Sequence, residues 1–115
     1  MSEAQSEEQF AEPFKRISVA EAKELIDHGG VSVIDVREDW EYNAGHVPNA
    51  QHIPLSKIIS AAQKHVEGDN LVFVCEVGQR SAVAAEFAAA LGKQYVYNME
   101  GGTSAWRKLG YPIET

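Results

Sequence analysis

Short apolar runs alternate with longer amphipathic segments along almost the whole chain. Runs rich in Val, Ile, Phe and Tyr are typical of buried strands, and segments with apolar residues at helical spacing follow them. This alternation implies β–α–β crossovers, so it predicts an α/β fold with a mostly parallel central sheet and helices on both faces. The strands are expected at residues 15–17, 31–36, 52–53, 71–74 and 95–99.

The most informative stretch covers residues 71–91. It opens with a continuous apolar run, LVFV, which suits a strand buried on both faces. The segment CEVGQR then breaks the pattern, with Cys75 at its start and Gly78 inside it. A helix is predicted to follow, with Ser81 as its N-cap and as a donor to the cysteine sulfur. The buried side of this helix is predicted to consist of Val83, Phe87 and Leu91.

Cys75 is the only cysteine, and it lies where the buried strand ends and the helix is about to begin. A tight loop from strand to helix points several backbone N–H groups inward and forms an anion nest, to which the helix dipole adds. A sulfur in such a nest is favoured as the thiolate. Gly78 permits the turn, and the guanidinium fork of Arg80 suits an oxyanion. The loop therefore predicts nucleophilic chemistry.

Two other strands are predicted to end at the same edge of the sheet. Asp35 and Arg37 lie at the end of one of them, and residues 100–103 follow the other, with Thr103 expected to cap the last helix. Ligands of such sheets bind beyond the carboxyl ends of the strands. Asp35 and Arg37 are candidates for supporting this site, although a structural ion pair, with Glu41 or with a backbone group as partner, is the favoured interpretation.

Composition limits the classes of protein that this chain can belong to. Its 115 residues are enough for one domain, predicted at residues 15–115, and residues 1–14 are expected to be an acidic, flexible tail. A net charge of −7 argues against nucleic acid as a partner. No apolar run is long enough to cross a bilayer, no secretory signal is recognisable, and one cysteine cannot form an internal disulfide. We expect a cytoplasmic protein, either a monomer or a weak homodimer.

Four ordered motifs then point to a known family. In this order, they are DVRE at residues 35–38, GHVPNA at residues 45–50, Cys75-x-x-Gly78-x-Arg80-Ser81, and a closing signature formed by Gly101, Gly102, Trp106 and residues 110–112. With these motifs, nearly all of the chain except its acidic tail resembles the rhodanese-type sulfurtransferases.

The resemblance implies a single rhodanese-like α/β domain that transfers a sulfane sulfur. The Cys75 thiolate would attack the outer sulfur of thiosulfate or of a persulfide, and the resulting Cys75 persulfide would pass its sulfur to cyanide, a thiol or a protein. No cofactor is required, and the histidines share no spacing that predicts a metal site. The active-site loop carried over from the family consists of Glu76, Val77, Gly78, Gln79, Arg80 and Ser81.

Two other functions stay open. One is a non-catalytic sulfur carrier, sensor or docking module with a rhodanese fold. The other is a phosphatase or arsenate reductase, which the loop length disfavours: four residues separate Cys75 from Arg80, whereas related phosphatases have five. Glu76 is a departure from the basic loops of some family members. If it points inward it opposes thiolate formation and repels thiosulfate, so modest activity with thiosulfate is expected.

Overall fold

The computed structural model describes residues 12–115. Residues 1–11 of the predicted tail lie outside this range. Phe14, which we assigned to the tail, is buried in the core. The packed part of the chain therefore begins before the first strand, because an aromatic side chain is available there to cover the edge of the sheet.

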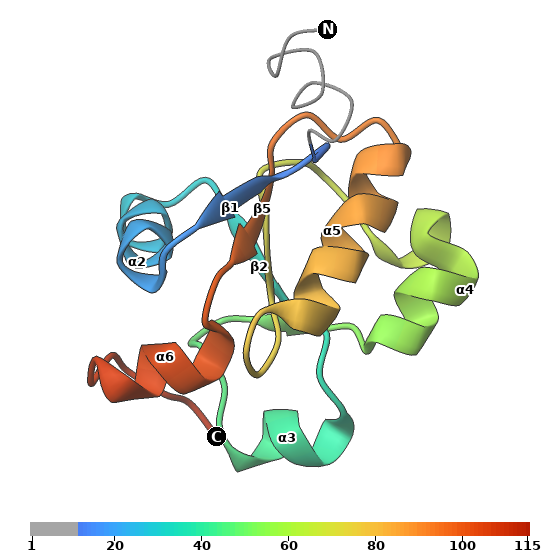
Figure 1. Cartoon of the computed structure of the whole chain (residues 1–115). Coiled ribbons are helices and arrows are strands. Elements are labelled where there is room, and N and C mark those ends of the chain that lie inside the picture. The colour runs from blue at the N-terminus through green and yellow to red at the C-terminus, as the bar shows by residue number, and fades with distance from the viewer. Residues whose placement is uncertain (1–11) are drawn as a thin grey trace, which may run out of the picture.

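The five strands of the described residues lie in one parallel sheet, as the alternation of strands and helices predicted (Figure 1). The order across the sheet is β1-β5-β4-β2-β3, so β4 lies at its centre. Parallel strands joined by crossover helices place all their carboxyl ends at one edge. The bounds are Lys15–Ile17 for β1, Ser32–Asp35 for β2, Gln51–His52 for β3, Leu71–Val74 for β4 and Val96–Met99 for β5.

Helices cover both faces of the sheet, as predicted. In Figure 1, α2 and α6 lie on one side of the sheet, α4 and α5 lie on the other, and α3 lies below its carboxyl edge. Each face buries a separate apolar cluster, which explains why β4 is buried along its whole length. The bounds are Val19–His28 for α2, Asp39–Ala44 for α3, Leu55–His65 for α4, Gln79–Ala90 for α5 and Gly102–Lys108 for α6.

The buried side of α5 is made of alanines, which differs from the prediction. Val83 and Leu91 are exposed, and Phe87 is only partly buried. The sheet on one side and α4 on the other leave room for methyl groups only, so the larger apolar residues turn toward the surface. The residues that α5 buries are Ser81, Ala84, Ala85 and Ala88.

Glycines, rather than hydroxyl side chains, precede α5 and α6, the helices that follow β4 and β5. The N-caps of α5 and α6 are Gly78 and Gly101, both with left-handed backbone angles (φ 100° and 82°). Ser81 and Thr103 are therefore not the caps that we predicted, and their hydroxyl groups are available for other contacts. Among the described residues, no helix is long and apolar enough to cross a membrane.

Candidate active site

The Cys75 side chain lies directly after β4 and is almost completely buried, with 1% of its surface exposed. Its Sγ accepts hydrogen bonds from the backbone N–H of Gly78 (3.1 Å) and from the hydroxyl of Ser81 (3.3 Å). Both donors belong to the start of α5. Among the described residues, the Gly78 amide is thus the only backbone N–H of the predicted nest that donates to the sulfur, and the Ser81 hydroxyl is the second donor.

Helix α6 binds the carbonyl side of the same loop. The backbone N–H of Thr103 donates to the Cys75 carbonyl (2.9 Å), and the Thr103 hydroxyl donates to the same oxygen (3.2 Å). The N–H of Ser104 donates to the Glu76 carbonyl (3.0 Å). Gly102 permits this approach, because a Cβ at that position would lie 2.4 Å from the Cys75 carbonyl oxygen. The first turn of α6 therefore fixes the orientation of the peptide groups that carry the cysteine.

Asn98 anchors the middle of the loop and was missed in the sequence. It is fully buried near the end of β5, and its Nδ2 donates to the Gly78 carbonyl (3.1 Å) and to the Glu100 carboxylate. By holding the Gly78 carbonyl, Asn98 helps to orient this part of the loop while the Gly78 N–H faces the sulfur. A polar residue inside an otherwise apolar strand was the signal that could have identified it.

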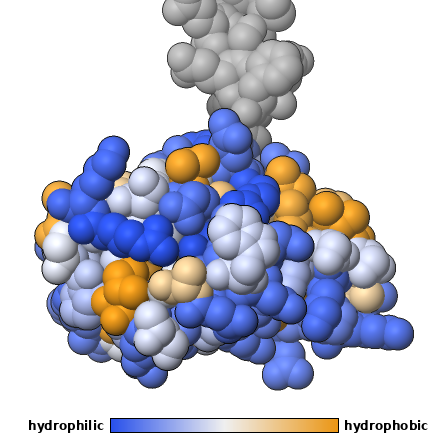
Figure 2. Space-filling view, turned by 90° about the horizontal axis from the view of Figure 1, so that it is seen from below, coloured by the Kyte–Doolittle hydropathy of each residue, from blue (hydrophilic) through white to orange (hydrophobic). Residues whose placement is uncertain are grey.

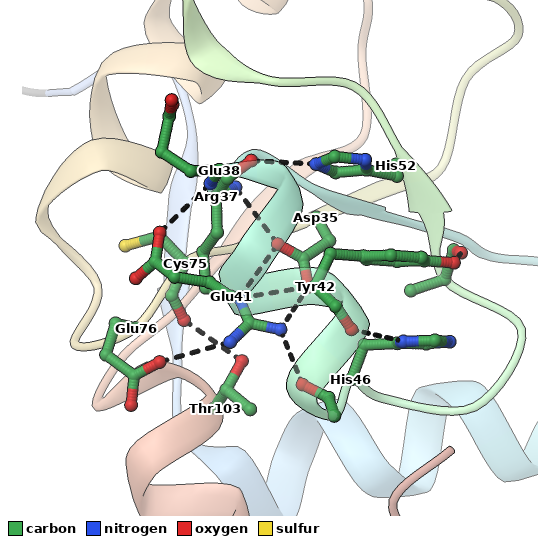
Figure 3. A network of polar contacts seen from close by, with 12 residues as sticks. Asp35, Arg37, Glu38, Glu41, Tyr42, His46, His52, Cys75, Glu76 and Thr103 are labelled. Atoms are coloured by element: carbon green, nitrogen blue, oxygen red, sulfur yellow. Dashed lines mark hydrogen bonds and ion pairs between the residues drawn. The ribbon is translucent and has the colours of Figure 1, made fainter. Parts of the chain in front are cut away.

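Asp35 and Arg37 form a buried ion pair, in agreement with the structural interpretation. The distances are 3.0 Å from Arg37 Nε to Asp35 Oδ1 and 2.8 Å from its Nη2 to Asp35 Oδ2. Nη2 also donates to the Gly45 carbonyl (2.8 Å), so the expected backbone partner is present (Figure 3). Burial acts to lower the pKa of Arg37, but the hydrogen bonds and the charge of Asp35 outweigh it and raise the pKa.

Glu76 bridges two arginines. Its carboxylate accepts hydrogen bonds from Arg37 Nη1 (3.1 Å) and from Arg107 Nη1 on α6 (3.2 Å). The sequence left open whether this carboxylate would face the sulfur or the solvent. The carboxylate lies at the rim of the loop, where the two guanidinium groups compensate its charge.

The two terminal nitrogens of Arg80 donate hydrogen bonds to the carboxylate oxygens of Glu41 on α3, at 2.8 and 2.9 Å. The fork that we expected to face an oxyanion is thus occupied, and Glu41, one expected partner of Arg37, pairs with Arg80 instead. The hydrogen bonds from Arg80 lower the pKa of Glu41 to about 2. No sequence spacing predicted this pair, because its members lie on different helices, α3 and α5, that are far apart in the chain.

Three stacked rings hold the segment between α3 and β3. Tyr42 lies between the rings of His46 and His52, with centroid distances of 3.7 and 4.4 Å. The ring Nδ1 of His46 bonds to the Tyr42 carbonyl at 2.9 Å. His46 therefore has a structural role in holding this loop, and Trp106 of the closing signature is buried in the core.

The outer rim of the loop is open to solvent. Val77 and Gln79 are exposed, and Trp40 on α3 has 71% of its surface exposed. Beside them lies a hollow of about 310 Å³ lined by Arg37, Trp40, Glu41, Ala44, Glu76 and Arg107. The underside of the molecule is mostly polar, with separate apolar patches (Figure 2). Among the described residues, no group of three or more His, Cys, Asp or Glu side chains is arranged to hold a metal ion.

A comparison with protein families decides what kind of domain this is. The profile of the rhodanese-like domain matches residues 18–109. The chain belongs to the rhodanese-like domain family. The match includes the DVRE and GHVPNA motifs and the whole Cys75 loop of this rhodanese-like domain.

Individual relatives cover most of this rhodanese-like domain. A protein named thiosulfate sulfurtransferase GlpE from Pseudoalteromonas translucida is 33% identical over 93 residues, covering 81% of this chain and 89% of the relative. The crystal structure of a rhodanese-related protein from Thermoplasma volcanium has 35% identity and a TM-score of 0.76, covering 88% and 98% of the two chains. A Rhodopseudomonas palustris protein of unknown function, named a possible tyrosine phosphatase, has 29% identity and a TM-score of 0.78, covering 88% and 85%.

Proposed function

We propose that the protein is a rhodanese-type sulfurtransferase whose nucleophile is Cys75. The observation that carries the proposal is the position of the only thiol, at the carboxyl end of the central strand with its sulfur bonded to Gly78 N–H and Ser81 Oγ. The thiolate attacks the outer sulfur of the donor and forms a new S–S bond. The S–S bond of the donor breaks, and its electron pair leaves with sulfite when the donor is thiosulfate, or with a thiolate when it is a persulfide.

The second half of the cycle regenerates the Cys75 thiolate. A nucleophilic acceptor, which is cyanide, a thiol or a protein thiolate, attacks the outer sulfur of the Cys75 persulfide, and the electron pair of the broken bond returns to Cys75. The two donors on α5 suit the charge on sulfur in both states, in the way that preorganised donors stabilise an oxyanion. The exposed rim at Val77 and Gln79 is where donor and acceptor would approach.

We infer a cytoplasmic location and a cofactor-free reaction. Cys75 must be a free thiol at the start of each cycle, which suits a reducing compartment. Each half of the cycle is a displacement at sulfur in which one bond forms as another breaks, so the chemistry needs no external oxidant or reductant, no organic cofactor and no metal. The oligomeric state, a monomer or a weak homodimer, stays a prediction, as do the physiological donor and acceptor.

The test is a mass spectrum of the protein after incubation with thiosulfate. The peptide that contains Cys75 should gain the mass of one sulfur atom, and cyanide should remove that atom as thiocyanate. Cys75→Ser should lose both reactions. A Cys75→Ser protein that still produced thiocyanate at the rate of the unchanged chain would rule out this mechanism.

The non-catalytic alternative is favoured by one observation, the almost complete burial of Cys75. A sulfur that small donors cannot reach would leave the fold as a docking or sensing module. Alkylation of Cys75 by iodoacetamide in the folded protein distinguishes the two functions. If Cys75 is alkylated only as fast as the whole protein unfolds, and no donor is turned over, the results would favour the non-catalytic module.

A phosphatase is disfavoured by the loop itself. Only four residues lie between Cys75 and Arg80, and the guanidinium that would hold a phosphate is bonded to Glu41 through both terminal nitrogens. Hydrolysis of p-nitrophenyl phosphate that depended on Cys75 would contradict this assignment.

A further inference from the structure

The charges around the active-site loop compensate one another in pairs. Arg80 bonds to Glu41, and Arg37 and Arg107 share Glu76, while Arg37 also bonds to Asp35. Every arginine that lines the loop or the hollow beside it thus has a carboxylate partner at 3.2 Å or less. A dianion that approaches the rim consequently meets no unpaired guanidinium among these residues.

The Glu41 carboxylate is held where it is by more than Arg80. Its Oε1 also accepts the backbone N–H of Glu38 (2.9 Å), which completes the capping box of α3. The side chain is only 10% exposed, whereas that of Arg80 is 36% exposed. A helix-capping contact therefore fixes the anion in place, and the more exposed arginine is held against it.

Additional acidic residues lie at the same end of α3. Glu38 and Asp39 are exposed at its start, and the chain as a whole carries a net charge of −7. The potential that a donor meets at this rim is therefore negative on balance. Repulsion grows with the charge of the donor, so a donor with two negative charges is hindered more than one with a single charge or none.

We propose that Glu41 is a specificity-determining residue, which occupies Arg80 and thereby selects sulfane-sulfur donors of low charge over thiosulfate. The preferred class is a persulfide with an uncharged substituent. This inference rests on the proposed sulfurtransferase function and concerns only the first half of its cycle. Arg80 is the group that would otherwise receive the sulfonate oxygens of thiosulfate.

The first half of the cycle balances for a persulfide donor. The Cys75 thiolate bonds to the terminal sulfur of R–S–SH, and the bond between the two donor sulfurs breaks. The electron pair leaves on the inner sulfur as RS⁻, and the proton moves to it, giving RSH and the Cys75 persulfide anion. Only one negative charge is present throughout, whereas thiosulfate brings two more to the same rim.

A matched pair of donors tests the charge dependence directly. Methanethiosulfonate carries one negative charge and thiosulfate carries two, and both release an oxidised sulfur leaving group. The rate of Cys75 persulfide formation is measured for each donor and divided by its rate with 2-mercaptoethanol, which corrects for intrinsic reactivity. We expect the corrected rate for methanethiosulfonate to exceed that for thiosulfate by about tenfold or more, since one extra negative charge at a rim of negative potential is worth roughly this factor. Equal corrected rates would overturn the inference.

The variant Glu41→Gln keeps the shape of the side chain and removes its charge. It should raise the thiosulfate rate by about tenfold and leave the rate with 2-hydroxyethyl persulfide within about twofold. Glu86→Gln is the control, because Glu86 lies on the exposed side of α5 and its substitution changes the net charge equally. Thermal melts verify that both variants are folded.

Salt provides a second readout of the same contact. For the unchanged chain, the thiosulfate rate should rise by about twofold between 20 and 200 mM NaCl, because screening weakens repulsion. In Glu41→Gln the released Arg80 should reverse this slope. If thiosulfate loads both proteins equally and with the same slope, Glu41 is only a structural partner and the inference fails while the proposed function stands. If no donor loads Cys75 in either protein, the proposed function itself fails.

Discussion

Two arginines flank the cysteine loop, and their surroundings are opposite. Arg37 is 1% exposed and is bonded to Asp35, Glu76 and the Gly45 carbonyl. Arg80 is 36% exposed at the side chain and is bonded to one carboxylate, that of Glu41. The first arginine ties together segments that are far apart in the sequence, and the second lies at a surface where substrates would pass.

The difference shows how identical groups acquire different roles. A buried guanidinium cannot lose a partner without leaving a charge in a low-dielectric environment, so Arg37 is held by its surroundings. The Arg80 pair has access to water, and its contribution to stability is therefore small. The residues of an ion pair that contributes little to stability can be substituted without loss of the fold. The Arg80–Glu41 pair is therefore suited to setting donor preference.

The largest effect is expected from Arg37→Met. The substitution leaves Asp35 as an unpaired buried carboxylate, so the free energy of unfolding should fall by about 3–5 kcal/mol. Urea denaturation measures the change. Arg80→Met is the matched control and should cost about 1 kcal/mol or less. Equal losses of unfolding free energy in the two variants would contradict the distinction between the two arginines.

Gly102→Ala tests whether the loop backbone is held independently of either arginine. The new Cβ would lie 2.4 Å from the Cys75 carbonyl oxygen at a φ of 59°, so we expect a loss of about 2–4 kcal/mol and slower persulfide formation. Gly110→Ala is the control, since Gly110 also has a positive φ (73°) but has nothing within 4 Å of the added Cβ. It should cost about 1 kcal/mol and leave the rate unchanged. A similar rate in both variants would show that α6 does not position the loop.

Acid should weaken the Arg80 pair in a defined window. The pKa of Glu41 is lowered from 4.5 to about 2, so the folded state is stabilised above pH 4.5 and loses this contribution as the pH falls toward 2. With screening at the exposed Arg80, the contribution is about 1 kcal/mol at pH 6. Urea denaturation of the unchanged chain and of Glu41→Gln should give this difference at pH 6 and almost none near pH 2. A difference that persists in acid would show that Glu41 acts through packing.

The smallest effect on stability is expected from removing a hydrogen bond to the Cys75 sulfur, because the donors of these bonds are neutral. Ser81→Ala removes the hydroxyl that donates to Cys75 Sγ at 3.3 Å, which should cost about 1 kcal/mol. The same loss of a donor should slow iodoacetamide alkylation of Cys75 several-fold at neutral pH. Ser60→Ala on the exposed side of α4 is the control. An unchanged alkylation rate would mean that the Gly78 amide suffices.

The architecture followed from the sequence because its signals are local. Apolar runs and helical spacing within each segment predicted the strands closely, and the local sequence Ser18 to Glu21 forms the capping box that opens α2. The position of Cys75 at the end of β4 also followed, since a strand, a glycine and a helix start are adjacent in the chain.

Contacts between distant segments could not be predicted in the same way. Nothing near Arg80 in the sequence indicates Glu41, and nothing near Cys75 indicates that Thr103 would bond to its carbonyl rather than cap a helix. The alanine side of α5 was missed for a related reason. Small apolar residues give a weak periodic signal, and only the packed structure shows that the space beside the sheet admits methyl groups alone.

The alanine side of α5 also sets the distance between the Ser81 hydroxyl and the Cys75 sulfur. Ala84, Ala85 and Ala88 determine how near α5 lies to the sheet, and the same rigid helix carries Ser81 at its beginning. A larger residue at any of these positions would lift the helix and draw the hydroxyl away from Cys75, with no change to any atom of the loop. Reactivity of this thiol thus depends on a spacer that lies behind it, and random mutagenesis for altered sulfur transfer should find variants there as well as at the rim.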